Sequence, residues 1–412
     1  AVGYATLNAQ NFTSSTDSNN TAVGYFAGVA VTTGVNNTLI GSLAGDALTE
    51  GGNNTALGIR SLGADTLGSR NTAIGYNTLL VQNFTSATNS YNVAMGHDAG
   101  RAITTGIFNT LIGSLAGDAL SDADTNVAIG ASALTTDTLG SKSTAVGHSA
   151  LEAQNFASAT TTHNTAVGAD SGKAISTGTT NSTFGSSSGA ALTTGTHNVL
   201  IGSYAGAGGV GNLTTGLRNI LIGHGAGQNN GNDNGNIAIG YETNCQGHAE
   251  AIVLGGNVDS VANTTFTFGR NDGSDRVHNN YTSNATFTRV SDERYKKEIQ
   301  NNTDCGLDFI NELRTVTFKF KAKSEIPNTL PDYDASKTTA DHTGKLYGMI
   351  AQEVKAAMAT HNITDFGGHS EEESSGIQGV AQSMFIYPLI KAVQELSAQV
   401  TALTARVTEL EG

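Results

Sequence analysis

The segment Ser291–Lys296 contains the residues best suited to chemistry, because a hydroxyl, carboxylates, a guanidinium group and an amine lie within one short stretch. A serine hydroxyl is a weak nucleophile and needs a base to take up its proton. A lysine amine can act as that base where burial lowers the lysine pKa toward neutrality. The plainer interpretation is that Ser291 caps a helix or turn, with Asp292 and Glu293 favourable at its start. Residue types alone leave both interpretations open.

Other residue types argue against several kinds of site. The adjacent carboxylates Glu371, Glu372 and Glu373 are interpreted as a solvated surface in preference to a metal site. Cys245 and Cys305 form neither a disulfide framework nor a CxxC spacing, and we expect no metal and no cofactor. The net charge of −14, without a basic stripe, predicts no nucleic-acid partner. No apolar run approaches the roughly 18 residues that span a bilayer, so no membrane insertion is expected.

The elements that must position the Ser291 segment begin with a repeat that occupies most of the chain. Glycine accounts for 51 of 412 residues and charged residues for 14%, which suits a stack of thin layers better than one large core. An apolar residue precedes each repeat glycine, and Asn stands four positions before 12 of the 13 glycines that have such a position, Ser143 being the exception. The glycines are spaced by 17 or 21 residues and are Gly3, Gly24, Gly41, Gly58, Gly75, Gly96, Gly113, Gly130, Gly147, Gly168, Gly185, Gly202, Gly223 and Gly240.

Each repeat predicts a very short strand with a turn residue at either end, as in Asn20–Gly24. The residues three and one before the glycine share a β-branched or apolar face. The small residue between them faces the other way, where we expect another backbone or chain to approach closely. The glycine predicts a positive φ, and the asparagines predict hydrogen bonds from coil to coil. One unit buries too little to fold alone, so the units should stack as a parallel β-solenoid or β-roll rising about 4.8 Å per coil.

A longer period of 72 residues relates near copies at 1–28, 73–100 and 145–172, each of which carries the tripeptide QNF. The 21-residue steps hold four extra residues, and QNF lies in these longer steps. We expect the insertions to form surface loops, which often bind ligands when a rigid scaffold carries them. A neutral insertion explains any single loop equally well.

The units NTAVG, NVAMG, NVAIG and NIAIG resemble the head repeats of trimeric autotransporter adhesins and the repeats of phage tail-fibre proteins. Three chains intertwine as a trimeric β-roll in those families, so the resemblance implies a homotrimer over about residues 1–270. The chain starts within a repeat and without methionine, and we expect it to be a fragment of a longer protein.

A second domain is predicted over 291–412, after a polar neck at 271–290. All three prolines lie beyond residue 326, and only 6 of the 21 Lys and Arg residues lie in 1–250. We predict a helix and then a strand in 307–321, a strand and then a helix in 346–359, and a loop over 361–380. These elements make 291–412 a small α+β domain.

The C-terminal segment at about 384–411 predicts a coiled coil. Its heptad seam has β-branched residues at position a and Leu at position d, a pattern that by itself favours two strands. Small or uncharged residues at e and g, and a resemblance of 406–411 to a known trimerisation motif, favour three strands instead. The seam residues are Ile386, Leu389, Val393, Leu396, Val400, Leu403, Val407 and Leu410.

The Ser291–Lys296 segment, with GMIAQEV at 348–354 and PLIKAVQEL at 388–396, resembles the endosialidase-type intramolecular chaperone, a self-processing domain of phage tailspikes and fibres. The resemblance implies that Ser291 and Lys296 form a dyad that cuts the bond between Val290 and Ser291. Asp292 and Arg294 would then orient the turn or pair between chains.

We therefore expect a mainly β, trimeric, extracellular fibre of a virion tail or a bacterial surface. It would attach to a cell-surface glycan or protein receptor, and its chaperone would drive assembly and then cleave itself off in a single turnover. A bacterial adhesin of the same architecture is the first alternative. A glycan-degrading tailspike is the second, and it is disfavoured because no carboxylate pair stands out in 1–250 beyond Asp122 and Asp124.

Overall fold

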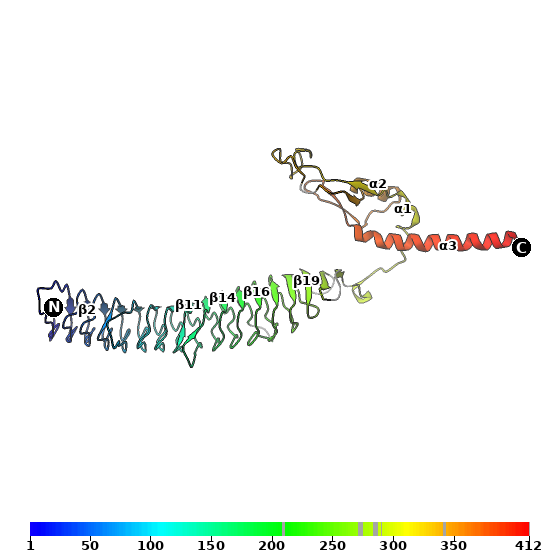
Figure 1. Ribbon diagram of the computed structural model, residues 1–412. Helices are drawn as coiled ribbons and strands as arrows, with labels where there is room; N and C mark the ends of the chain where they lie inside the picture. The colour runs from blue at the N-terminus through cyan, green and yellow to red at the C-terminus, as the bar shows by residue number, and fades with distance from the viewer. Residues whose placement is uncertain (208–210, 271–274, 283–286, 290, 341–342, 412) are drawn as a thin grey trace. The chain divides into compact units, whose positions relative to one another are not determined.

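The computed structural model describes residues 1–207, 211–270, 275–282, 287–289, 291–340 and 343–411. The chain divides into two compact units, Ala1–Tyr295 and Lys296–Gly412, and each unit has a hydrophobic core of its own. The first unit is a β-solenoid whose coils stack from the N-terminus to β19 (Figure 1). The predicted mainly β solenoid is therefore confirmed.

One strand from each coil joins a parallel ladder in which every strand pairs with the strand of the next coil. The register is the one that the repeat predicts, because Thr38 pairs with Thr55 and Leu39 with Ala56. The parallel strands are β1 (Thr21–Val23), β2 (Thr38–Ile40), β3 (Thr55–Leu57), β5 (Thr72–Ile74), β7 (Val93–Met95), β8 (Thr110–Ile112), β9 (Val127–Ile129), β11 (Thr144–Val146), β13 (Thr165–Val167), β14 (Ser182–Phe184), β15 (Val199–Ile201), β16 (Ile220–Ile222), β17 (Ile237–Ile239), β18 (Ile252–Gly256) and β19 (Thr265–Arg270).

The ladder ends with two antiparallel strands, β20 (Arg276–Asn280) and β21 (Thr288–Arg289). Both lie in the segment predicted as a polar neck. Strand β20 runs back along β19, so part of the neck extends the sheet instead of linking two domains. The division between the two compact units falls after Tyr295.

The middle residue of each strand faces the interior of its own coil. Ala22, Leu39 and Ala56 are fully buried, whereas the residues on either side of each are partly or largely exposed. The predicted alternation of faces is confirmed. The middle residue lies in the buried core of its own solenoid, where other parts of the same chain surround it.

The 72-residue period reflects how the interior is filled. In the coil of β2, Leu39 fills the centre, and Gly45 lies against it, so that a Cβ on Gly45 would lie 2.8 Å from Leu39 Cδ2. In the coil of β3 the strand contributes only Ala56, and Leu62, at the position equivalent to Gly45, is buried in its place. The interior takes its leucine from the strand in the first of these two coils and from the following turn in the second. The same two arrangements recur 72 residues later, with Leu111 before Gly117 and Ala128 before Leu134.

The glycine and the asparagine that recur in each unit have distinct structural roles. Gly41 adopts φ +136°, and a Cβ there would lie 2.4 Å from the carbonyl oxygen of Gly58 in the next coil. The side chain of Asn54 is buried, and its Oδ1 accepts a hydrogen bond from the backbone N–H of Asn71 at 2.9 Å. The predicted asparagine ladder is confirmed. At its one break, Ser143 Oγ lies 2.6 Å from Thr162 Oγ1, which keeps the buried polar groups bonded.

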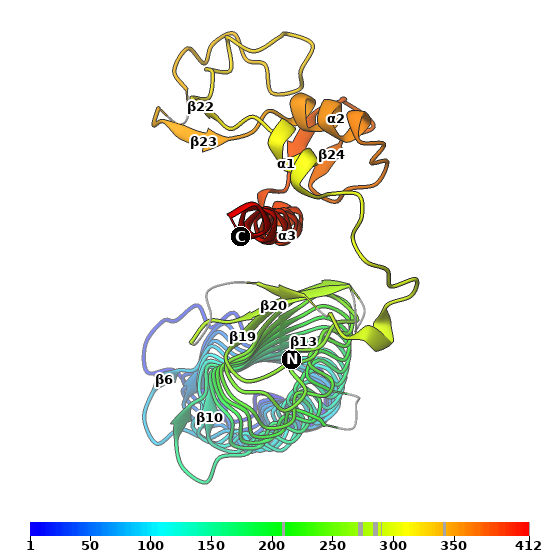
Figure 2. The same cartoon turned by 90° about the vertical axis from the view of Figure 1, so that its right-hand side faces the viewer.

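The 21-residue steps form projecting loops, as predicted, but QNF is not their exposed part. Gln82 and Phe84 are buried, and only Asn83 between them is exposed. Two additional two-stranded ladders form the base of the loops, and in the end-on view β6 and β10 lie at the rim of the coils (Figure 2). These strands are β4 (Gly68–Ser69) with β6 (Thr88–Asn89), and β10 (Gly140–Ser141) with β12 (Thr160–Thr161).

The second unit is a small mixed domain. The predicted order of helix, strand, strand and helix is confirmed, but the segment predicted as a loop contains a short antiparallel hairpin, β24 with β25. Two of its strands, β22 and β23, also pair antiparallel. The elements are α1 (Leu307–Glu312), β22 (Val316–Phe318), β23 (Leu346–Gly348), α2 (Ala351–Thr360), β24 (His369–Glu371), β25 (Gln378–Val380) and α3 (Ile386–Glu411).

Candidate functional site

The Ser291–Lys296 segment forms a tight turn held by one ion pair. A 3-10 turn, η1 (Glu293–Tyr295), follows Asp292. The guanidinium group of Arg294 donates two hydrogen bonds to the Asp292 carboxylate, from Nε to Oδ1 at 2.9 Å and from Nη2 to Oδ2 at 2.6 Å. The backbone N–H of Arg294 also donates to Oδ1 at 2.9 Å. These bonds from Arg294 lower the pKa of Asp292, so the turn is held by a charged carboxylate at neutral pH.

Within one chain Asp292 and Arg294 pair with each other across the turn that follows Ser291. The acceptor that closes the turn is Asp292, next to the serine, in the manner of an aspartate whose side chain bonds the backbone two residues on.

The two predicted dyad residues both have exposed side chains in the single chain. Ser291 belongs to the first compact unit, and Lys296 is the first residue of the second. Val290, the predicted acyl residue of the cleaved bond, lies outside the described residues. The centre of the segment is therefore an ordered turn, and the division between the two compact units falls just before Lys296.

The C-terminal helix α3 packs on its own domain with one face and leaves its heptad seam exposed. Ala392 is only 4% exposed, and Glu395 accepts the backbone N–H of Leu307 at the start of α1, with Oε2 2.7 Å from the nitrogen. On the seam, by contrast, Val393 and Leu403 are each 64% exposed. A row of exposed Leu, Ile and Val side chains on a 26-residue helix is unfavourable in water unless a partner covers it.

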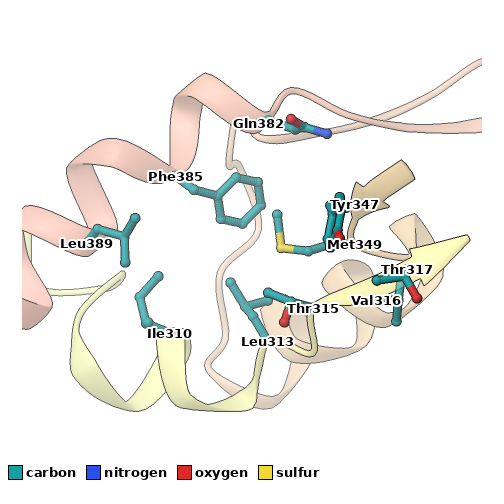
Figure 3. Close-up of a pocket in the computed structure, with 11 residues that line it drawn as sticks. Ile310, Leu313, Thr315, Val316, Thr317, Tyr347, Met349, Gln382, Phe385 and Leu389 are labelled. Carbon is teal, nitrogen blue, oxygen red and sulfur yellow. The ribbon is translucent and has the colours of Figure 1, made fainter. Parts of the chain in front are cut away.

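An apolar groove adjoins this seam inside the second unit. It has a volume of about 820 Å³ and lies between α1, the β22–β23 pair and the start of α3. Ile310, Leu313, Met349 and Phe385 point into the same space (Figure 3). Leu389 belongs to both the groove and the heptad seam, so the two apolar surfaces are continuous. Sequence reasoning missed the groove, because its lining comes from elements far apart in the chain.

The acidic residues of the hairpin are engaged in ordinary surface contacts. Glu371 pairs with Lys355 of α2, and Glu372 accepts the hydroxyl of Ser375. No group of three or more His, Cys, Asp or Glu residues that could hold a metal ion occurs among the residues that the structure describes. The interpretation of this cluster as a solvated surface agrees with these contacts.

The solenoid offers a second uncovered apolar surface, which we call the sheet face. It is formed by the outward residues of the strand ladder, and no charged residue occurs at the two outward positions of β1 to β17. Side chains one before the repeat glycine remain partly exposed, for example Ile112 and Ile201. Such a long, uncharged ribbon of β-branched residues is typical of a surface that another element covers.

Comparison with known proteins finds a family for part of the chain. Residues 291–363 match the family model described as chaperone of endosialidase, a peptidase family of the S74 type, and the match begins at Ser291. The chain therefore combines a β-solenoid with a chaperone-of-endosialidase domain, which is consistent with a tail-fibre or endosialidase-type protein. That family implies self-cleavage as a general activity. No curated protein matches the sequence significantly. Among the described residues, no helix is long and apolar enough to cross a membrane.

Proposed function

We propose that this chain forms a homotrimeric, extracellular attachment fibre whose C-terminal chaperone drives assembly and then cleaves itself off at Ser291. The observation that carries the proposal is the chaperone-of-endosialidase match, which starts at the residue expected to be the nucleophile. The solenoid is the part that remains after cleavage and contacts a glycan or protein receptor on a cell surface. A virion tail or a bacterial surface would carry such a fibre.

Assembly begins at α3 in this proposal. The face of α3 that carries Ala392 is already occupied by its own domain, so the exposed seam is available to other chains. Three seams packed together would bury the alternating β-branched and leucine side chains. The groove that shares Leu389 with the seam would receive apolar side chains from a neighbouring copy.

The sheet face gives the solenoids a reason to pack side by side once α3 has aligned them. Parallel coils rise by about 4.8 Å each, so three solenoids in the same register present the same residues to one another along their length. Contacts between whole chains are non-local and therefore slow to form in the correct register. A C-terminal coiled coil removes that difficulty by holding the three chains together from one end.

Cleavage follows from assembly. Ser291 Oγ attacks the carbonyl carbon of the preceding residue, Val290, while the amine of Lys296 accepts the hydroxyl proton and returns it to the Ser291 nitrogen as the amide bond breaks. Val290 is then joined to Ser291 Oγ as an ester. Water hydrolyses this ester to the carboxyl group of Val290 and the free hydroxyl of Ser291, which cuts the chain. A lysine amine acts as a base only after it has been removed from water, and Lys296 is exposed in the single chain. We infer that neighbouring chains cover it, so that only an assembled trimer is cut. Arg294 and Asp292 hold the turn so that the hydroxyl stays near the bond.

The test is the chain mass and the oligomeric state after expression. We expect the wild-type chain to give two bands, of 290 and 122 residues, and a trimeric solenoid by light scattering. Lys296→Ala should give one uncut band that is still trimeric. Lys297→Ala, which removes the adjacent exposed lysine, is the matched control and should be cut normally. Complete cleavage of Lys296→Ala would eliminate Lys296 as the base, and a monomeric wild-type fibre would eliminate the assembly scheme.

A further inference from the structure

We propose that an outer corner of the solenoid, formed by Arg70, Tyr91 and Phe108, is a binding site for a pyranose-containing surface glycan. The corner residue of each coil stands immediately before the buried asparagine of the ladder and points outward. The backbone N–H of Phe108 donates to the carbonyl oxygen of Ser90, directly before Tyr91, at 2.8 Å, so these corners lie on consecutive coils. This inference rests on the proposed attachment function and names the site through which it acts.

The three side chains form an ordered stack on the surface. The rings of Tyr91 and Phe108 are nearly parallel, with an angle of 8° between planes and 5.3 Å between centroids. The guanidinium carbon of Arg70 lies 5.4 Å from the centroid of Tyr91, over its ring. Arg70 Nε also donates to Asn89 Oδ1 of the inserted loop at 3.1 Å, which ties the stack to the loop. The stack is held in place before any ligand arrives.

The fold does not require aromatic residues at these positions. Tyr91 is 41% exposed and Phe108 51% exposed, so neither fills the core. Both corners have positive φ, 51° and 60°, a conformation that asparagine tolerates better than an aromatic residue. The first 72-residue copy has Asn19 and Asn36 at the equivalent corners, with φ of 48° and 61°. The same backbone is therefore built without rings elsewhere in this chain.

The third copy strengthens the comparison. Its equivalent corners are His163 and Thr180, with φ of 51° and 59°, and Lys142 stands where the middle copy has Arg70. The stacked pair of rings with its cation is thus confined to the middle copy, although all three copies share one backbone at the corners. The shared backbone does not need these rings, and their exposed position leaves them available for a contact outside the chain.

The chemistry of the stack suits a sugar ring. One face of a pyranose presents C–H groups, which pack on the electron-rich face of an aromatic ring, while its hydroxyls need hydrogen-bonding partners at the edge. Thr125 follows Phe108 at the next corner and is too short to cover a ring face. Lys142 is the residue at the corner beyond it, two coils or about 10 Å from Phe108 along the axis. Asn89, Arg70 and Lys142 are the exposed polar groups that flank the rings.

The experiment uses the full trimeric chain and the double substitution Tyr91→Asn with Phe108→Asn. Asparagine is the residue that the first copy uses at these corners, so the fold should be retained. The matched control is His163→Asn with Thr180→Asn, which makes the same change at the equivalent corners of the third copy. The probe is an array of purified bacterial surface polysaccharides. We expect the wild type and the control to bind the same polysaccharides, and the Tyr91/Phe108 variant to bind at least about tenfold more weakly.

The outcomes separate this site from attachment in general. Undiminished polysaccharide binding by the Tyr91/Phe108 variant would overturn the site and leave attachment standing. Wild-type binding to cells that is abolished by protease and survives removal of polysaccharide would show a protein ligand and overturn the glycan. Loss of the trimer in the Tyr91/Phe108 variant would show that the rings serve a contact between chains, which also overturns the site. A wild-type fibre that binds no cell in a panel of bacteria would overturn the attachment function itself.

Discussion

The side-chain oxygen of Asn109 accepts the backbone N–H of Asn126, one coil further along the solenoid, at 2.9 Å. The amide nitrogen of the same side chain donates to the carbonyl oxygen of Ala123 at 2.8 Å. All three residues are fully buried. One asparagine therefore satisfies two backbone groups of the neighbouring coil that water does not reach, and a column of asparagines repeats this contact from coil to coil.

Replacing Asn109 by Ala should lower the free energy of unfolding by about 2–4 kcal/mol, because it leaves a buried donor and a buried acceptor without partners. Urea denaturation followed by circular dichroism measures the change. The control is Asn11→Ala, at an exposed asparagine outside the column, which should change stability by less than about 0.5 kcal/mol. Equal effects of the two substitutions would mean that the column contributes nothing beyond ordinary surface asparagines.

We expect a leucine at position 45 to be tolerated only when Leu39 is replaced by a smaller residue, because the two positions are in contact in the interior. Gly45→Leu alone should destabilise by about 1–3 kcal/mol, because the new side chain overlaps Leu39, and Leu39→Ala alone by about 2–5 kcal/mol, because it leaves a cavity. The double variant Leu39→Ala/Gly45→Leu reproduces the pairing of Ala56 with Leu62. Gly45 and Leu62 have similar φ, 55° and 53°, so the backbone accepts the exchange.

The double variant should therefore recover part of the stability that either single variant loses, since Leu48 Cδ1 still lies 2.9 Å from the Cβ position of residue 45. Thermal denaturation of the wild type, the two single variants and the double variant forms a complete cycle. Additive losses in the double variant would show that the two positions do not share one space in the interior, contrary to the explanation of the 72-residue period.

The buried carboxyl of Asp65 should make the stability of the solenoid depend on pH. Burial raises the pKa of Asp65, and the hydrogen bonds from Gln82 at 2.7 Å and from the backbone of Gly68 at 2.9 Å offset only part of that effect. A raised pKa means that the folded chain holds the proton more tightly than the unfolded chain. Its contribution to stability is therefore complete below the unfolded value of about 3.9 and is lost as the pH rises through the folded value.

The measurement is the difference in the free energy of unfolding between the wild type and Asp65→Asn, taken at several values between about pH 4 and pH 7. We expect this difference to decrease as the pH rises. An increase with pH would mean that the folded chain prefers the ionised carboxylate, and that the hydrogen bonds outweigh burial at this position.

The seam of α3 should control both assembly and cleavage. Leu396→Asp would place a charge from each chain at the centre of the predicted coiled coil, and we expect a single-chain mass by light scattering and an uncut band on a gel. Ala398→Asp puts the same charge at the exposed outer position f of the same helix and should leave both results unchanged. A cleaved Leu396→Asp chain would separate cleavage from assembly.

Several features follow from the sequence without reference to the structure. The repeat predicts the position of each strand and the column of asparagines, because a parallel stack places equivalent residues directly above one another. The heptads likewise predict the final helix and extend over most of α3. The chaperone segment that begins at Ser291 is also recognisable from its residues alone. These are local or strictly periodic properties, and they need no knowledge of what lies opposite.

The tertiary structure decided matters that depend on closure of the chain. Alternation along a strand shows that Ala22 and Val23 point to opposite sides, but only a closed coil shows that the side of Ala22 is the interior. The burial of Gln82 in a segment predicted to be an insertion, the hairpin of β24 and β25, and the choice of which face of α3 meets α1 have the same cause. Each of these features depends on which residues, distant in sequence, pack into the same space. A sequence pattern does not show which of them are in contact.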